Sequence, residues 1–182
     1  HTKRDQAFLK KTHLLKVEPE AHHKSDFANI SQCFHQLFIE KHSTYNPQFS
    51  AAFLYEMHAN GLIEFHSFRE PDSQKIIASI GLFTQQDIIT TPIVGYDTSQ
   101  PKELGLYRLL MAVLLKQTYE SGLEMNLSSG AASFKRARGG EPTLEYTAFY
   151  CQHLPCSQQI IMTAFAKILN KFAPKVFQEN QL

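Results

Sequence analysis

Near Asn60-Gly61 the apolar residues of this chain change their spacing, and the change separates two kinds of secondary structure. From Ser25 to about His42 they recur every three or four residues, which predicts an amphipathic helix with Ser25 as its N-cap. A second such helix follows Asn46-Pro47 and ends at Asn60-Gly61. Three β-rich runs separated by short turns come next: Leu62–Arg69, Lys75–Phe83 and Asp87–Gly95. Runs this close together predict an antiparallel meander.

The second half of the chain alternates helices with strands. Pro101–Ser121 predicts a helix that is apolar on nearly all sides, and we expect it to be the most buried one. After it the sequence predicts a strand, a short basic helix, another strand and a closing helix, at Leu123–Leu127, near Phe134–Arg138, at Thr143–Cys151 and at Ser157–Phe172. This order predicts an α+β fold with a mixed, mostly antiparallel central sheet and helices on both of its faces.

The length of 182 residues suits one well-buried domain. A content of 43% hydrophobic and 19% charged residues is typical of a globular chain. We assign residues 1–24 to a lead-in segment that ends with a first strand at His13–Val17, and residues 25–182 to the domain itself. The basic, polar beginning resembles a continuation from something upstream, so an upstream domain of the same protein is a candidate partner.

The formal net charge of +1 argues against a protein whose main task is to neutralise nucleic-acid phosphates. No run approaches the ~18 apolar residues of a membrane helix, so no membrane partner is expected. Three cysteines are an odd number and favour reduced thiols in a cytoplasmic protein over a disulfide framework. Cys151, His153 and Cys156 lack a second ligand pair at a usual spacing, so no metal site is predicted.

The stretch Leu123–Tyr150 points to an anion site. Its first strand leads through Ser128-Ser129-Gly130 into a helix that carries Lys135, Arg136 and Arg138. Small residues let backbone N–H groups approach a ligand, and the start of a helix favours a negative charge. We therefore predict binding of a phosphorylated or carboxylated molecule. The same residues could also form a solvated helix face, with the two serines acting only as caps.

Two motifs resemble the GNAT acyltransferase superfamily. Lys102-Glu103-Leu104-Gly105-Leu106-Tyr107 is similar to its phosphate loop, Arg/Gln-x-x-Gly-x-Gly/Ala, at the start of the central helix. Ser128, Ala131, Phe134, Lys135, Gly139 and Gly140 follow the register of a second GNAT motif. Phe-Lys followed by Gly in this place resembles the FemAB-like branch. The order of elements over roughly residues 25–155 resembles the same superfamily. Tyr107 replaces the second Gly, and Lys135 replaces a Tyr that often protonates the leaving thiolate.

The resemblance implies transfer of an acyl group from an acyl-CoA-like co-substrate to the amine of a small molecule or peptide. The residues it implies for donor binding are Lys102, Gly105, Ser128, Ser129, Gly130, Lys135 and Arg138. Asp97, at the end of the meander, is the first candidate for the base, and Glu145 and Tyr146 are the alternatives. Asp97 before Thr98-Ser99 is also a good turn residue.

Two other functions stay open at this stage. An aminoacyl-tRNA-dependent transferase, as in part of the FemAB-like branch, would make tRNA a partner. The second open function is a degenerate, non-catalytic GNAT-like binding domain of a larger protein. This alternative stays open because Tyr107 and Lys135 replace residues of the GNAT motifs. The transferase reading needs a wedge-shaped gap between the strands at 87–95 and 123–127, with the tip of the central helix aimed at a bound anion.

Overall fold

The computed structural model of the chain describes residues 2–128 and 130–179. These residues form two compact units that follow one another along the sequence, His1–Ser129 and Gly130–Leu182. The first unit contains the sheet, and the lead-in segment set apart in the sequence analysis contributes a helix and a strand to it. None of the described helices combines the length and the apolar character needed to cross a bilayer.

The sheet of the first unit has five strands in the order β1-β2-β3-β4-β5. The first four are antiparallel neighbours: β1 (Leu15–Val17), β2 (Glu64–Arg69), β3 (Ile76–Gln85) and β4 (Ile88–Tyr96). The last strand, β5 (Glu124–Met125), pairs parallel to β4. The predicted meander and the mixed, mostly antiparallel sheet are therefore confirmed.

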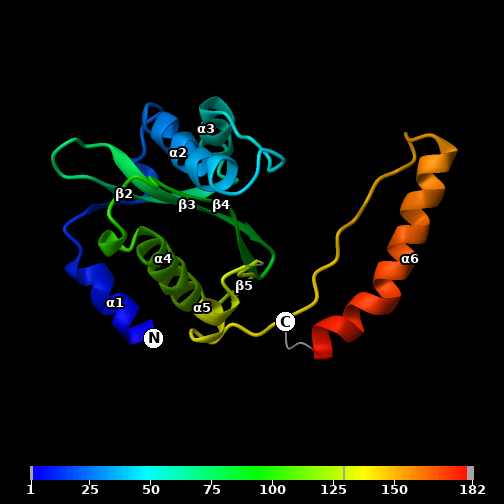
Figure 1. Cartoon of the computed structure of the whole chain (residues 1–182). Helices are drawn as coiled ribbons and strands as arrows, with labels where there is room; N and C mark the ends of the chain where they lie inside the picture. The colour runs from blue at the N-terminus through cyan, green and yellow to red at the C-terminus, as the bar shows by residue number, and fades with distance from the viewer. Residues whose placement is uncertain (1, 129, 180–182) are drawn as a thin grey trace. The chain divides into compact units, whose positions relative to one another are not determined.

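Helices cover both faces of this sheet, as the sequence predicted (Figure 1). On one face lie α2 (Asp26–His35) and α3 (Ala51–Ala59), and on the other lie α1 (Thr2–Lys11) and α4 (Leu106–Ser121). Three short turns complete the unit: η1 (Pro19–Ala21), the π-helical η2 (Gln36–Glu40) and η3 (Lys102–Leu104). The sequence pattern did not predict the π turn that follows α2.

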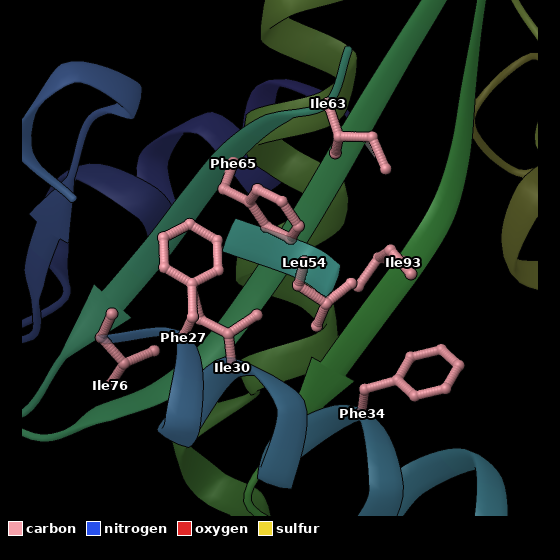
Figure 2. Close-up of a cluster of buried hydrophobic side chains, with 8 residues drawn as sticks. All are labelled: Phe27, Ile30, Phe34, Leu54, Ile63, Phe65, Ile76 and Ile93. Atoms are coloured by element: carbon pink, nitrogen blue, oxygen red, sulfur yellow. The ribbon is translucent and has the colours of Figure 1, made fainter. Parts of the chain in front are cut away.

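The apolar stripe predicted after Ser25 forms the core between α2, α3 and the sheet (Figure 2). The buried members of this cluster are Phe27, Ile30, Phe34, Leu54, Ile63, Phe65, Ile76 and Ile93. Gly95 of β4 brings the helix close to the sheet, because a Cβ there would lie only 2.4 Å from the backbone N of Phe34. The backbone of α2 therefore rests directly on β4.

The central helix α4 differs from its prediction at its start. Pro101 does not begin it. Instead η3 and Gly105, at φ +58°, precede the first α-helical residue, Leu106. The rest is as expected. Seven buried residues line the helix from Leu106 to Leu114, more than any other described helix has, and Gly122 at φ +70° ends it.

The second unit contains α5 (Ala132–Arg136) and α6 (Cys156–Glu179). The predicted strand Thr143–Cys151 is wrong, since residues 141–151 have no β pairing in the structure. A strand needs a ladder partner, and the described part of this unit has no other strand to supply one. The closing helix was predicted to end at Phe172 but runs past Pro174 to Glu179.

Candidate functional site

The strands β4 and β5 pair over only two residues. Their register holds only Ile88 opposite Glu124 and Ile89 opposite Met125, and the N–H of Asn126 donates to the Ile89 carbonyl at 2.9 Å. β4 continues to Tyr96, and no described strand pairs with this edge of it beyond Ile89. Among the described residues, this edge of β4 is therefore open from Thr90 to Tyr96, and we refer to it as the open edge of β4.

A β-bulge in β4 lies on the same part of the strand. From the pair Gly81–Ile93 to the pair Phe83–Thr90, the register advances two residues along β3 but three along β4. One extra residue therefore sits near Thr91-Pro92, where Pro92 has no N–H to give to a ladder. A bulge shifts which backbone groups of a strand face each edge.

Beyond the bulge, the N–H groups of β4 point alternately toward β3 and toward the open edge of β4. The N–H of Asp97 donates to the Ile77 carbonyl of β3 at 2.8 Å. Because successive N–H groups of a strand point to opposite edges, those of Tyr96 and Val94 point away from β3. Backbone N–H groups held in this way can stabilise a developing oxyanion. Pro92, within the predicted strand, was the one sequence signal for this bulge.

The start of α4 lies at the C-terminal end of β4. Gly105 caps the helix in the left-handed region, and its carbonyl accepts the N–H of Leu109 at 3.0 Å. The opening turn of a helix leaves its first N–H groups without intrahelical acceptors and carries a partial positive charge, so it favours an anion. The positive φ of Gly105 favours glycine, and a Cβ here would also lie 2.9 Å from the Phe8 ring, which would have to move.

A cavity of about 260 Å³ joins these two features. It is lined by Tyr96, Pro101, Lys102, Gly105, Leu106, Tyr107 and Arg108. Tyr107, which stands in place of the second Gly of the GNAT loop, thus borders the cavity. The Arg108 Nε donates to Asp5 Oδ1 at 2.6 Å, and its guanidinium lies 4.5 Å from the centre of the Phe8 ring. Lys102 is exposed at the edge of the cavity.

The carboxylate of Asp97 is held in a turn. Its Oδ1 accepts hydrogen bonds from the Ser99 N–H at 3.0 Å and the Ser99 hydroxyl at 2.6 Å, and Lys75 Nζ lies 3.8 Å from Oδ2. Burial alone would raise the pKa of Asp97, but the bonds from Ser99 and the charge of Lys75 outweigh it and lower that pKa. A carboxylate stabilised in this way is a weak base, and its catalytic role remains a prediction.

Most of the remaining predicted residues belong to the second unit. Burial lowers the pKa of Lys135 there, while the charge of Glu145 acts in the opposite direction. The Arg138 guanidinium lies 3.3 Å from the centre of the Phe134 ring and donates to the Phe134 carbonyl at 2.8 Å. Tyr146 follows Glu145 in the segment without β pairing. The roles predicted for these residues stay predictions.

The predicted small-residue turn follows β5. Ser128, at φ +57°, donates its N–H to Asn126 Oδ1 at 2.6 Å, and Gly130 has φ +79°. Ser129 lies outside the described residues. Of the predicted donor-binding residues, the structure brings Lys102 and Gly105 together at one cavity. In the described parts of the chain, no group of three or more His, Cys, Asp or Glu side chains is arranged to hold a metal ion.

Comparison with known proteins identifies the fold. No protein-family model matches the chain, and no curated protein matches it. Among solved structures, an acetyltransferase from Trypanosoma brucei is similar with a TM-score of 0.57 and 18% identity, over 75% of this chain and 99% of that one. Glucosamine-6-phosphate N-acetyltransferase from Arabidopsis thaliana has a TM-score of 0.54 and 14% identity, over 76% and 99% of the two chains.

A third similar structure was crystallised with a ligand. It is described as a predicted acetyltransferase with acetyl-CoA from Clostridium acetobutylicum, with a TM-score of 0.56 and 11% identity, over 78% of this chain and 98% of that one. Identities this low show a shared architecture. The mostly antiparallel sheet with helices on both faces matches the folds of these acetyltransferases.

Proposed function

We propose that the protein is an N-acyltransferase that moves an acyl group from an acyl-CoA-like thioester to an amine. The observation that carries this proposal is the open edge of β4, where the N–H of Val94 is directed away from β3, together with the cavity that Tyr96 of β4 shares with the start of α4. Two named acetyltransferases with the same fold support it, as does the similar structure that contains acetyl-CoA.

The proposed donor site uses the cavity at the start of α4. The helix tip and the ammonium of Lys102 bind the donor's phosphates, and the acyl thioester lies along the open edge of β4. The amine nitrogen attacks the thioester carbonyl carbon, and the Val94 N–H stabilises the negative charge that develops on the carbonyl oxygen. The C–N bond forms, the C–S bond breaks, and the thiolate leaves.

Two proton transfers complete the proposed reaction. The attacking ammonium loses a proton to a base, for which Asp97 is the first candidate and Glu145 and Tyr146 are the alternatives, and an acid protonates the thiolate. Lys135 and Arg138 are proposed as phosphate contacts with Ser128, Ser129 and Gly130. The finer assignment to the FemAB-like branch has only Phe134, Lys135 and Gly139 in its favour.

A binding experiment tests the donor site. Acetyl-CoA at 100 times its dissociation constant should raise the free energy of unfolding by about 2.7 kcal/mol, and free CoA should act similarly because it keeps the phosphates. Lys102→Glu should reduce this shift, whereas Lys41→Glu, an exposed lysine beyond the end of α2, should not. No shift with either ligand would contradict the proposal.

A second experiment tests the oxyanion donor. Val94→Pro removes one N–H that faces away from β3 and therefore no β3–β4 hydrogen bond. It should lower kcat by roughly 100-fold, the typical cost of one lost oxyanion donor. Val94→Ala keeps the N–H and should retain most activity. Equal activity of both variants, measured as release of the CoA thiol in the presence of amines, would exclude this role for Val94.

A further inference from the structure

A second cavity lies on the α2 side of the sheet, near the end of β4. Its volume is about 290 Å³, and it is lined by Phe34, His35, Ile39, Gln48, Phe49 and Ser50. Phe34 and His35 end α2, Ile39 belongs to η2, and the other three precede α3. The π turn of η2, closed by the Lys41 N–H to the Gln36 carbonyl at 3.2 Å, forms the part that the sequence did not predict. Such turns occur often at functional sites.

The cavity has an apolar floor and a polar rim. Phe34 and Ile39 are only 3% and 6% exposed and form the floor. Phe49 is half-buried, and its ring centre lies 5.3 Å from that of Phe34. The exposed side chains of His35, Gln48 and Ser50 form the rim. This distribution is typical of a small-molecule site whose apolar walls give affinity and whose few polar groups give orientation.

The size of the cavity fits an aromatic ring. An apolar cavity of roughly 150 Å³ is enough to bind benzene. A volume of about 290 Å³ therefore accommodates a phenyl ring together with a short aliphatic chain. Aromatic walls suit such a group, since offset or edge-to-face ring pairs add stabilisation beyond the area they bury.

One residue of the cavity wall, Phe34, lies against β4. The backbone N of Phe34 would lie 2.4 Å from a Cβ on Gly95, which stands between Val94 and Tyr96 on β4. Figure 2 shows Phe34 beside the end of this strand, with its ring directed away from the other labelled side chains of the core. A group bound next to Phe34 is therefore close to the backbone that carries the outward N–H groups.

We propose that this cavity is the acceptor pocket and that it selects amines with an aromatic or bulky apolar substituent. The proposal rests on the proposed N-acyltransferase function. The ring occupies the apolar floor, and a short aliphatic tether extends past the polar rim to bring the amine to the thioester at the edge of β4.

Two amines of different size test this pocket. With acetyl-CoA as the donor, thiol release with 2-phenylethylamine should show a kcat/KM at least tenfold above that with ethylamine, mainly through KM. Phe49→Ala removes one wall of the pocket and should reduce this preference at least fivefold, mainly by raising KM for 2-phenylethylamine. Phe49→Leu keeps an apolar wall, so its preference for 2-phenylethylamine should lie between those of the unchanged protein and Phe49→Ala. This variant keeps the test decisive if the alanine variant folds poorly.

Phe53→Ala is the matched control. Its ring stacks on Phe49, with centres 5.4 Å apart, but does not line the cavity. This variant should keep the preference for the aromatic amine. Equal kcat/KM for the two amines in the unchanged protein, or an equal loss of the preference in the Phe53 and Phe49 variants, would overturn the acceptor pocket while leaving acyl transfer intact.

A direct binding measurement tests the pocket independently of acyl transfer. If no amine releases thiol, the proposed function fails, and the heat of binding of 2-phenylethylamine to the protein then decides about the pocket. Binding that is weakened at least fivefold in Phe49→Ala supports an aromatic amine site. Absence of binding to the unchanged protein overturns it.

Discussion

Single residues determine how closely the layers of the fold approach one another. At both Gly95 and Gly105, a neighbouring group already occupies the space that a Cβ would need. The neighbouring group differs between the two positions. At Gly105 the neighbour is the ring of Phe8, whereas at Gly95 it is the backbone of α2. A ring can rotate, but a helix backbone cannot move without repacking the core. The sequence marks neither glycine as a contact, because contacts between distant segments have no local signal.

Gly95→Ala should therefore be strongly destabilising. We expect a loss of about 3 kcal/mol in the free energy of unfolding, at the upper end for overpacking a core, because α2 must shift away from β4. Gly122→Ala is the comparison: its φ is +70°, but nothing lies near its Cβ, so it should cost only about 1 kcal/mol. Urea denaturation of both variants measures the difference, and equal losses would show that space at Gly95 is not limiting.

His22 makes the stability of the first unit depend on pH. Its Nδ1 lies 3.1 Å from the Pro19 carbonyl oxygen, and its Nε2 lies 2.8 Å from the Ser67 hydroxyl. Burial lowers the pKa of His22, and the nearby His58 acts in the same direction, against the carbonyl of Pro19 and the charge of Asp26.

The sign of the effect follows from that lowered pKa. As the pH falls through about 6.5, the unfolded chain takes up the proton more readily than the folded protein, so the free energy of unfolding decreases. The decrease ends below the folded-state pKa. Urea denaturation at several pH values between 8 and 5 should show a smaller slope for His22→Gln than for the unchanged chain. His23→Gln, at the exposed neighbour, should leave the slope as it was.

Among the elements, those predicted best are fixed by local patterns. The positions of α2, α3 and the three long strands follow from apolar spacing and from signals such as Asn60-Gly61, which act over a few residues. The η2 turn and the bulge near Thr91-Pro92 depend on packing and register instead. The strand expected at Thr143–Cys151 alternates as a strand should, but alternation cannot supply a pairing partner.

Ser25 and Ser50, which precede helices α2 and α3, also show that a local sequence signal does not always lead to the expected contact. Ser50 accepts the N–H of Phe53 at 3.1 Å, whereas Ser25 makes no such bond and has helical dihedrals, although the sequence predicted it as a cap. Ser50→Ala should therefore cost about 1 kcal/mol of unfolding free energy. Ser25→Ala should cost close to nothing. An equal loss in both variants, measured by thermal or urea denaturation, would contradict this assignment.

At the scale of the first compact unit, the lead-in segment, residues 1–24, contributes the helix α1 and the strand β1. Residues 1–12 show only a weak helical pattern in the sequence. In the structure α1 packs along α4, with the Gln6 amide donating to the Ala112 carbonyl at 3.0 Å. Its Phe8 lies under Gly105, so this helix also supports the start of α4, where the donor site is proposed.

The ion pair between Asp5 and Arg108 should couple these two helices. Asp5 is 1% exposed, and removing Arg108 would leave its charge buried without this partner. We expect Arg108→Ala and Asp5→Ala each to cost about 2 kcal/mol, less than a fully buried pair because Arg108 is partly exposed. The double variant should cost clearly less than the sum, by more than 1 kcal/mol. Additive losses would mean that this ion pair does not couple α1 to α4. Lys116→Ala with Glu120→Ala, an exposed pair on the same helix α4, should show a coupling below about 0.5 kcal/mol.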